Sequence, residues 1–190
     1  MDKRQKIFDS ALQLFVEFGF HGTPTSKIAK DAGVSNGILF HYFGTKEELI
    51  KELYIAVKEE LNGFLAIKIH ARDDIETQLR KVYLYSVYWG LEHPEKFHYI
   101  QQIHFSPHIS QISERTLHEQ MQSHIALIEQ AKSLRIIKQL PTDLVYTLAM
   151  SHITGIYTYA RTLKPRPRKL AIETSFALFW DMITEKDKQV

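Results

Sequence analysis

The sequence predicts an all-α protein of 190 residues. Apolar residues recur at helical spacing along most of the chain, and prolines and glycines interrupt this pattern at intervals that suit helices of ordinary length. No alternation of apolar and polar residues, as a strand would show, continues for more than a few positions. The proportions of 44% hydrophobic and 24% charged residues are typical of a globular protein.

Two helices are expected before residue 33. The first carries an apolar stripe over residues 7–18 and ends at Gly19, because glycine suits the position after a helix C-terminus. Thr23 followed by Pro24 predicts the start of a second helix, with threonine as the N-cap and proline in the first turn. This helix is short, because Gly33 ends it.

Ser35 is expected to cap a third helix over residues 36–43. Thr45 and Glu48 have the spacing of a capping box, which predicts a fourth helix that continues toward Leu61. Further helices, separated by prolines, are expected near residues 73–93, 95–106, 111–136, 142–163 and 167–184.

The composition excludes several classes of protein. The chain contains no cysteine, which excludes disulfide frameworks, thiolate metal sites and cysteine nucleophiles and fits a reducing compartment. The N-terminus is charged, and no apolar signal segment follows it. Two stretches of 17 residues, 97–113 and 144–160, lack charge but fall short of the ~20 apolar residues of a membrane span. We therefore expect a cytoplasmic protein with no membrane partner.

Residues 23–43 have the pattern of a DNA-binding helix-turn-helix, two short helices separated by a turn at Gly33. The second helix would enter the major groove, so its exposed residues must be short or polar. Ser35, Asn36 and Gly37 at its start meet this condition. The net charge of +2 does not by itself indicate a nucleic-acid partner.

The spaced elements of this region are Ile28-Ala29, Ala32-Gly33-Val34-Ser35, Leu39-Phe40, Phe43 and Lys46-Glu47. In this arrangement residues 19–49 resemble the DNA-binding signature of the TetR (tetracycline repressor) family of bacterial transcriptional regulators, and the resemblance covers roughly residues 5–55. It implies a three-helix helix-turn-helix DNA-binding domain over residues 1–46, with the start of the fourth helix to about residue 55. It also implies a larger helical effector-binding and dimerisation domain over residues 47–190.

The resemblance further implies a homodimeric, sequence-specific repressor that a small-molecule effector releases from its operator DNA; activation in place of repression stays open. The implied DNA contacts are Thr25, Ser35, Asn36, Gly37, Phe40, His41, Tyr42, Thr45 and Lys46. The hydroxyls of Thr25 and Ser35 would meet phosphates. Asn36 and Gly37 would lie nearest to base edges, and Lys46 would pair with a phosphate.

Phe40 departs from the family pattern, which usually has tyrosine at this position, and so removes one hydroxyl contact with DNA. Tyr42 is equally a candidate for the core, and Asn36 for a solvated helix end. An enzyme is not indicated, because the sequence shows no nucleophile–base constellation, phosphate loop or metal-ligand spacing. A helical ligand-binding or interaction module that has lost DNA binding is the remaining alternative.

Residues 83–105 are rich in aromatic side chains, and an apolar pocket between helices is where bundles bind small molecules. The candidate pocket residues are Tyr83, Tyr88, Trp89, Phe97, Tyr99 and Phe105. The alternative is that these rings belong to the core. The expected ligand is an apolar or aromatic-compatible effector, either a cation or a flat or long apolar molecule. No metal or other cofactor is expected, because the histidines form no HExxH pattern.

The last two expected helices are apolar on more than one face, so each must bury a second face against another surface. The family resemblance implies a two-fold, four-helix dimer contact there, and the candidate residues are Leu148, Ile156, Phe176 and Trp180. Such a dimer would hold two recognition helices ~34–36 Å apart on a pseudo-palindromic operator. The alternative is a core formed within one chain.

Overall fold

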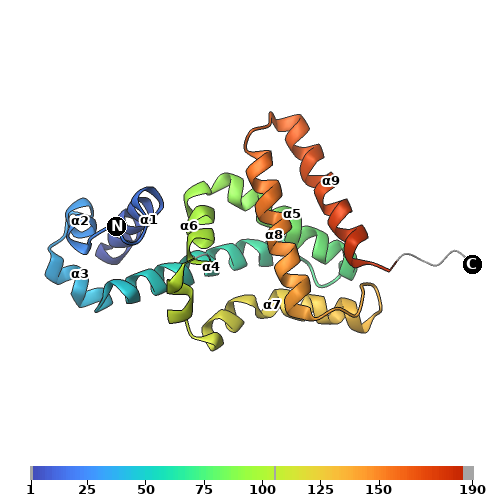
Figure 1. Cartoon of the computed structure of the whole chain (residues 1–190), viewed down its shortest axis with the longest axis horizontal. Helices are drawn as coiled ribbons and strands as arrows, with labels where there is room; N and C mark the ends of the chain where they lie inside the picture. The colour runs from blue at the N-terminus through green and yellow to red at the C-terminus, as the bar shows by residue number, and fades with distance from the viewer. Residues whose placement is uncertain (1, 105, 186–190) are drawn as a thin grey trace, which may run out of the picture. The chain divides into compact units, whose positions relative to one another are not determined.

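The prediction of an all-α fold is confirmed by the computed structural model of the chain, which describes residues 2–104 and 106–185 (Figure 1). Within these residues every regular element is a helix. The elements are α1 (Lys3–Phe18), α2 (Thr25–Asp31), α3 (Asn36–Phe43), α4 (Lys46–Lys68), α5 (Ile75–Glu92), α6 (Pro94–His104), the 3-10 helix η1 (Pro107–Gln111), α7 (Glu114–Ser133), α8 (Thr142–Ala160) and α9 (Pro165–Ile183). Across the same residues, no helix combines the length and the apolar character that crossing a membrane requires.

Two of the predicted N-caps are confirmed. The Ser35 hydroxyl accepts a hydrogen bond from the Ile38 N–H at 3.3 Å at the start of α3. The Thr45 hydroxyl accepts one from the Glu48 N–H at 3.1 Å at the start of α4. Each cap satisfies one of the backbone N–H groups that a helix N-terminus leaves without an internal partner.

The prediction that Thr23 caps α2 is wrong, because Pro24 occupies the N-cap position. The Thr23 side chain is buried, and its hydroxyl donates to the carbonyl oxygens of Leu14 at 3.0 Å and Gly19 at 2.8 Å. Thr23 therefore fixes the start of α2 against the end of α1, and its hydroxyl is unavailable to α2.

The described chain forms two compact units. Unit 1 contains residues 1–60 and 93–117, and unit 2 contains residues 61–92 and 118–190, apart from the residues that the structure does not describe. These limits differ from the boundary expected at residues 46 and 47, because α6 returns to pack on α1. The Tyr99 ring stacks on Phe15 with centroids 6.2 Å apart, and its hydroxyl donates to the Ile50 carbonyl oxygen at 2.8 Å.

The core of unit 1 holds α3 in place. Ile7 of α1, Ile28 of α2 and Leu39 of α3 are all fully buried. The rings of Phe8 and Phe43 lie 5.2 Å apart and close the contact between α1 and α3. One face of α3 is therefore anchored, and the remaining surface of this helix is left for other contacts.

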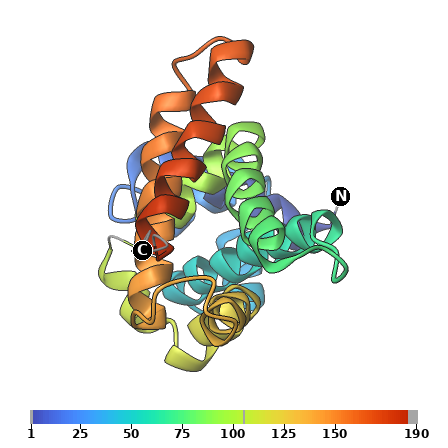
Figure 2. The same ribbon diagram turned by 90° about the vertical axis from the view of Figure 1, so that its right-hand side faces the viewer.

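In unit 2, α8 and α9 run side by side and α5 packs on both of them (Figure 1, Figure 2). Tyr83 of α5 joins these helices, because its ring lies 5.5 Å from that of Phe176 and 5.6 Å from that of Phe179. The Tyr83 hydroxyl is 2.8 Å from that of Ser175, and either hydroxyl can be the donor. An ion pair between Arg80 and Glu173 adds a second link between α5 and α9.

Candidate functional site

Helix α3 has one buried and one exposed side. Leu39 and Phe43 are buried in unit 1. The exposed positions in and before this helix are Ser35, Asn36, Gly37, Phe40, His41 and Tyr42. These are all the candidate DNA contacts of the third helix, so the fold brings them together on a single free surface.

Two large aromatic side chains, Phe40 and Tyr42, are part of this surface. Phe40 is 40% exposed and Tyr42 is 38% exposed. The His41 ring meets Tyr42 edge-on, with ring centroids 5.8 Å apart. Tyr42 is thus partly exposed and carries a hydroxyl, whereas Phe40 offers ring surface without a hydrogen-bond donor.

The N-terminus of α3 suits a close approach by an anion. The first N–H groups of a helix lack internal partners and point outward, and the helix dipole adds partial positive charge. A Cβ atom added at Gly37 would meet only the Ser35 Oγ, at 3.9 Å. Packing within the protomer therefore does not require glycine at this position. The absence of a side chain at Gly37 instead leaves room for another molecule to approach the N-terminus of α3.

The other candidate contacts lie beside this helix. Thr25 begins α2 and is half-buried, and Thr45 is exposed before α4. Lys46 donates a hydrogen bond from Nζ to the Phe20 carbonyl oxygen. Burial lowers the pKa of Lys46, and the Glu47 carboxylate partly offsets this effect. Because an ammonium group has three donors, Lys46 can bind Phe20 and still contact a phosphate.

Comparison with known proteins identifies the family. Residues 7–53 match the sequence model described as bacterial regulatory proteins, tetR family. The fatty acid metabolism regulator protein of Bacillus subtilis (strain 168) is 38% identical over 63 residues, which are 33% of this chain and 31% of that protein. The HTH-type transcriptional regulator RutR of Escherichia coli (strain K12) is 46% identical over 59 residues, which are 31% of this chain and 26% of that protein. Each match spans about a third or less of the curated relative.

A solved structure is similar over the whole length of this chain. It is that of a tetR family transcription regulator from Shewanella sp. PV-4, with a TM-score of 0.91 and 29% identity over 98% of this chain and 100% of that chain. The chain belongs to the tetR family. The relatives of this TetR-family protein are transcription regulators and not enzymes.

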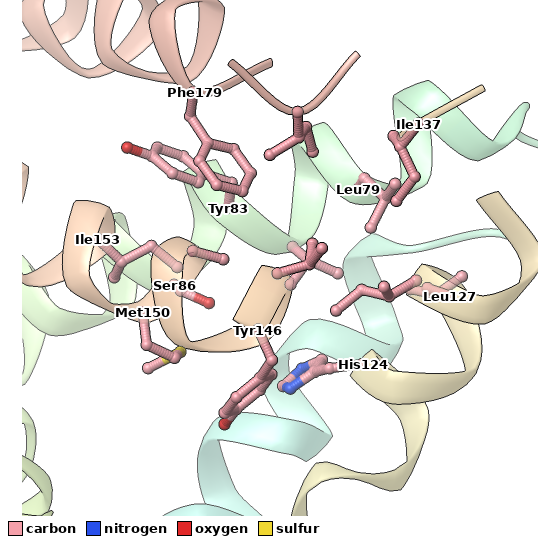
Figure 3. A pocket seen from close by; sticks show the side chains of 15 residues that line it. Leu79, Tyr83, Ser86, His124, Leu127, Ile137, Tyr146, Met150, Ile153 and Phe179 are labelled. Atoms are coloured by element: carbon pink, nitrogen blue, oxygen red, sulfur yellow. The ribbon is translucent and has the colours of Figure 1, made fainter. Parts of the chain in front are cut away.

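Unit 2 of this TetR-family protein contains a narrow cavity with a volume of about 50 Å³ (Figure 3). Its walls come from α5, α7, α8 and α9 and from the segment between α7 and α8. Most of the lining side chains are aliphatic or aromatic. Among the six aromatic residues that were predicted to form a pocket, only Tyr83 lines this cavity.

The structure distributes the other five predicted pocket residues elsewhere. Tyr88 and Trp89 belong to α5 but do not line the cavity. Phe97 and Tyr99 are buried in unit 1, because α6 belongs to that unit. Phe105 lies outside the described residues. Sequence reasoning missed Tyr146 and the aliphatic residues around it, which come from separate helices and form no local pattern, whereas His124 was among the histidines expected to lie at the surface or to line a pocket.

Three of the four predicted dimer residues pack inside the protomer. Ile156 and Phe176 are buried in unit 2, and Trp180 stacks on Phe176 with centroids 5.8 Å apart. Leu148 is half-buried. The exposed large apolar side chains of α8 and α9 are instead Leu144, Tyr159, Leu170, Leu178 and Met182. We name these five residues the outer apolar face of unit 2.

Within the described residues, His, Asp and Glu side chains form no group of three that could hold a metal ion.

Proposed function

We propose that this TetR-family protein is a homodimeric, sequence-specific DNA-binding transcription regulator that represses from a pseudo-palindromic operator in the cytoplasm and is released by a small-molecule effector. The observation that carries DNA binding is the exposed side of α3, where short and polar residues surround the helix N-terminus. Asn36 and Gly37 would lie nearest to base edges, and Ser35 and Thr25 would bind phosphates.

Site selection from random duplexes tests this proposal directly. The purified protein should enrich a pseudo-palindrome, and the logarithm of its affinity for that site should fall linearly with the logarithm of the salt concentration. Fluorescence anisotropy between about 50 and 200 mM salt measures this slope. Indifference to every duplex at the lower salt concentration would remove the regulator proposal.

We expect Lys46→Ala to flatten the salt dependence by about one unit per protomer, because each protomer loses one phosphate contact. Lys164→Ala is the matched control, since this exposed lysine precedes α9 in unit 2. An unchanged slope in Lys46→Ala would limit Lys46 to its structural bond with Phe20.

The outer apolar face supports a dimer contact through α8 and α9. On α8, Ser151, Gly155 and Tyr159 are exposed and spaced by four residues, so they share one side of the helix. On α9, Leu170 and Leu178 are 70% and 65% exposed. Exposed apolar side chains on two helices that pack side by side suit contact with a second copy of the same surface across a two-fold axis.

Gly155→Arg should convert the dimer into a monomer without unfolding it. A Cβ atom at Gly155 meets nothing within 4 Å, so the protomer can accept the side chain, but a partner surface cannot. Sedimentation velocity should show the smaller species, and operator affinity should fall at least about 10-fold because one protomer reaches only one half-site. Gly63→Arg is the control, since its Cβ also meets nothing within 4 Å and it lies on α4. A dimeric Gly155→Arg would place the interface elsewhere.

The cavity of unit 2 is the proposed effector site. An effector can change operator affinity only if it binds more tightly to a conformation that binds the operator less well. Operator titrations with and without a cavity ligand measure this coupling, and an operator affinity that no cavity ligand changes would contradict the proposed release mechanism.

A further inference from the structure

We propose that the cavity of unit 2 takes an uncharged, mostly hydrocarbon ligand with one oxygen function, a hydroxyl or a carbonyl, which lies against Tyr146 and His124. This inference names the chemical class of the effector, so it rests on the proposed function. Four observations carry it: the absence of charge in the lining, the polar end of the cavity, the orientation of Tyr83, and a second hollow beside the first.

No Lys, Arg, Asp or Glu is among the described residues that line the cavity. Leu79, Ile137, Ile153 and Phe179 supply much of its apolar wall (Figure 3). A charged group moved from water into such a lining loses its hydration and meets no Lys, Arg, Asp or Glu as a counterion, which costs several kcal/mol or more. The lining therefore selects against carboxylates and ammonium groups.

Hydrogen-bonding groups gather at one end of the cavity. Figure 3 shows Tyr146 and His124 next to one another, away from Phe179 and Ile137. The rings of Tyr146 and His124 are stacked with centroids 6.4 Å apart. Burial raises the pKa of Tyr146 to about 12, so the phenol keeps its proton at neutral pH. A protonated phenol can donate to a carbonyl or hydroxyl oxygen of a ligand.

Tyr83 is the other tyrosine of the lining, but its hydroxyl is already engaged. It shares a hydrogen bond of 2.8 Å with Ser175, and its oxygen points away from the centre of the cavity in Figure 3. Because its hydroxyl is engaged by Ser175, Tyr83 contributes ring surface to the ligand site. The Tyr146 oxygen lies on the side of its ring away from Phe179 and Ile137 (Figure 3), so Tyr146 would donate to a ligand oxygen at that end of the cavity.

A second hollow of about 320 Å³ adjoins the first, and His124 and Leu127 line both of them. The polar members of its lining are uncharged and include Asn62 and Gln78. The Asn62 Oδ1 is buried and has no hydrogen-bond partner among the described residues, so it can accept a bond from a ligand hydroxyl. The cavity and the second hollow, which His124 and Leu127 separate, thus both suit an uncharged polar group.

The cavity is too small to accept a ligand unless lining residues move. About 50 Å³ holds a few water molecules and is much less than the ~300–1,000 Å³ of a typical ligand pocket. A ligand must therefore displace His124 and Leu127 of α7 and join the two hollows. Binding would then favour a conformation in which this part of α7 has moved, which is the differential affinity that an effector needs.

Isothermal titration calorimetry on the full chain at pH 7 tests the ligand class with four probes of equal chain length: 2-decanone, 1-decanol, decanoate and decylammonium. We expect 2-decanone and 1-decanol to bind at least about 10-fold more tightly than either ion. Tyr146→Phe should weaken 2-decanone about 10-fold, because the buried carbonyl loses its donor. Tyr88→Phe, the matched control, should leave this affinity unchanged, because Tyr88 belongs to α5 but does not line the cavity, and thermal unfolding checks that both variants are folded.

The proposal is overturned if either ion binds as tightly as 2-decanone, if no probe binds, or if a folded Tyr146→Phe keeps the parent affinity for 2-decanone. The effector role is measured separately, by operator titrations in the presence of 2-decanone. Binding of 2-decanone without any change in operator affinity would support the ligand class and contradict the effector function. Salt-dependent operator binding combined with tight decanoate binding would contradict the ligand class and still support the proposed DNA binding.

Discussion

Gly37→Leu should reduce operator affinity about 100-fold while leaving the folded chain at least as stable as the parent. Glycine inside a helix costs about 0.5–1 kcal/mol relative to alanine, and the structure shows open space where the side chain would begin. On the DNA side, a leucine at the N-terminus of α3 would hold the helix away from the base edges. The loss of ~1–3 kcal/mol of base recognition at each of two half-sites gives the expected factor.

Gly63→Leu is the matched control, because it should keep or raise stability in the same way without reducing operator affinity. Gly63 is another helical glycine, and a Cβ atom there would meet nothing within 4 Å, whereas one at Gly37 meets only the Ser35 Oγ in ordinary contact at 3.9 Å. Gly63 lies in α4, at a distance in sequence from the recognition helix. Urea unfolding should show equal or higher stability for both variants, and anisotropy should show lost affinity only for Gly37→Leu. Parent-like operator binding by Gly37→Leu would mean that α3 does not enter the groove by its N-terminus.

Lys58→Met should stabilise the folded chain by about 3 kcal/mol at pH 7. The Lys58 side chain is only 2% exposed, and the described residues give its ammonium group no hydrogen bond or ion pair. Burial lowers its pKa from 10.5 to about 8, a difference that corresponds to about 3 kcal/mol of destabilisation while the lysine is charged in both states. Methionine fills a similar volume without a charge, so the variant removes this cost.

The pH dependence identifies the cause of the gain. Below pH 8 Lys58 is charged in the folded and the unfolded chain, so its cost is fully present. Between pH 8 and pH 10.5 the unfolded chain binds more protons, so the stability of the parent rises with pH. The advantage of Lys58→Met should therefore shrink to about 1 kcal/mol near pH 10 in urea unfolding. Lys51→Met, on the same helix and half-buried, should show little gain. A gain that does not vary with pH would assign the effect to packing.

Local structure was predictable where the deciding contacts are local. The caps at Ser35 and Thr45 depend on a backbone N–H three residues away, so the sequence contains both partners. Thr23 was misassigned for the opposite reason. Its hydroxyl donates to the carbonyl oxygens of Leu14 and Gly19, nine and four residues back, and the Leu14 contact becomes available only when α1 has formed and the chain has turned after it.

The aromatic run in residues 83–105 shows a second limit of sequence reasoning. These rings are neighbours in the chain, but the start of α6 at Pro94 sends Phe97 and Tyr99 into the core of unit 1, and Tyr83 remains in unit 2. The cavity is built from four helices instead, and its polar end joins Tyr146 with His124, which are 22 positions apart. Residues that converge from separate helices give no signal in a window of sequence.

The hydrogen bond between Tyr99 and the Ile50 carbonyl also affects how this protein can be divided. Since α6 completes the core around Phe15 and Ile50, a fragment that stops after residue 60 would present these apolar side chains to water. Unit 1, which carries α3, is one compact unit formed from two separate stretches of the sequence. Any single cut between residues 60 and 93 separates this unit from part of its own interior, so grafting its first 60 residues onto a relative would require the acceptor to supply a ring equivalent to Tyr99.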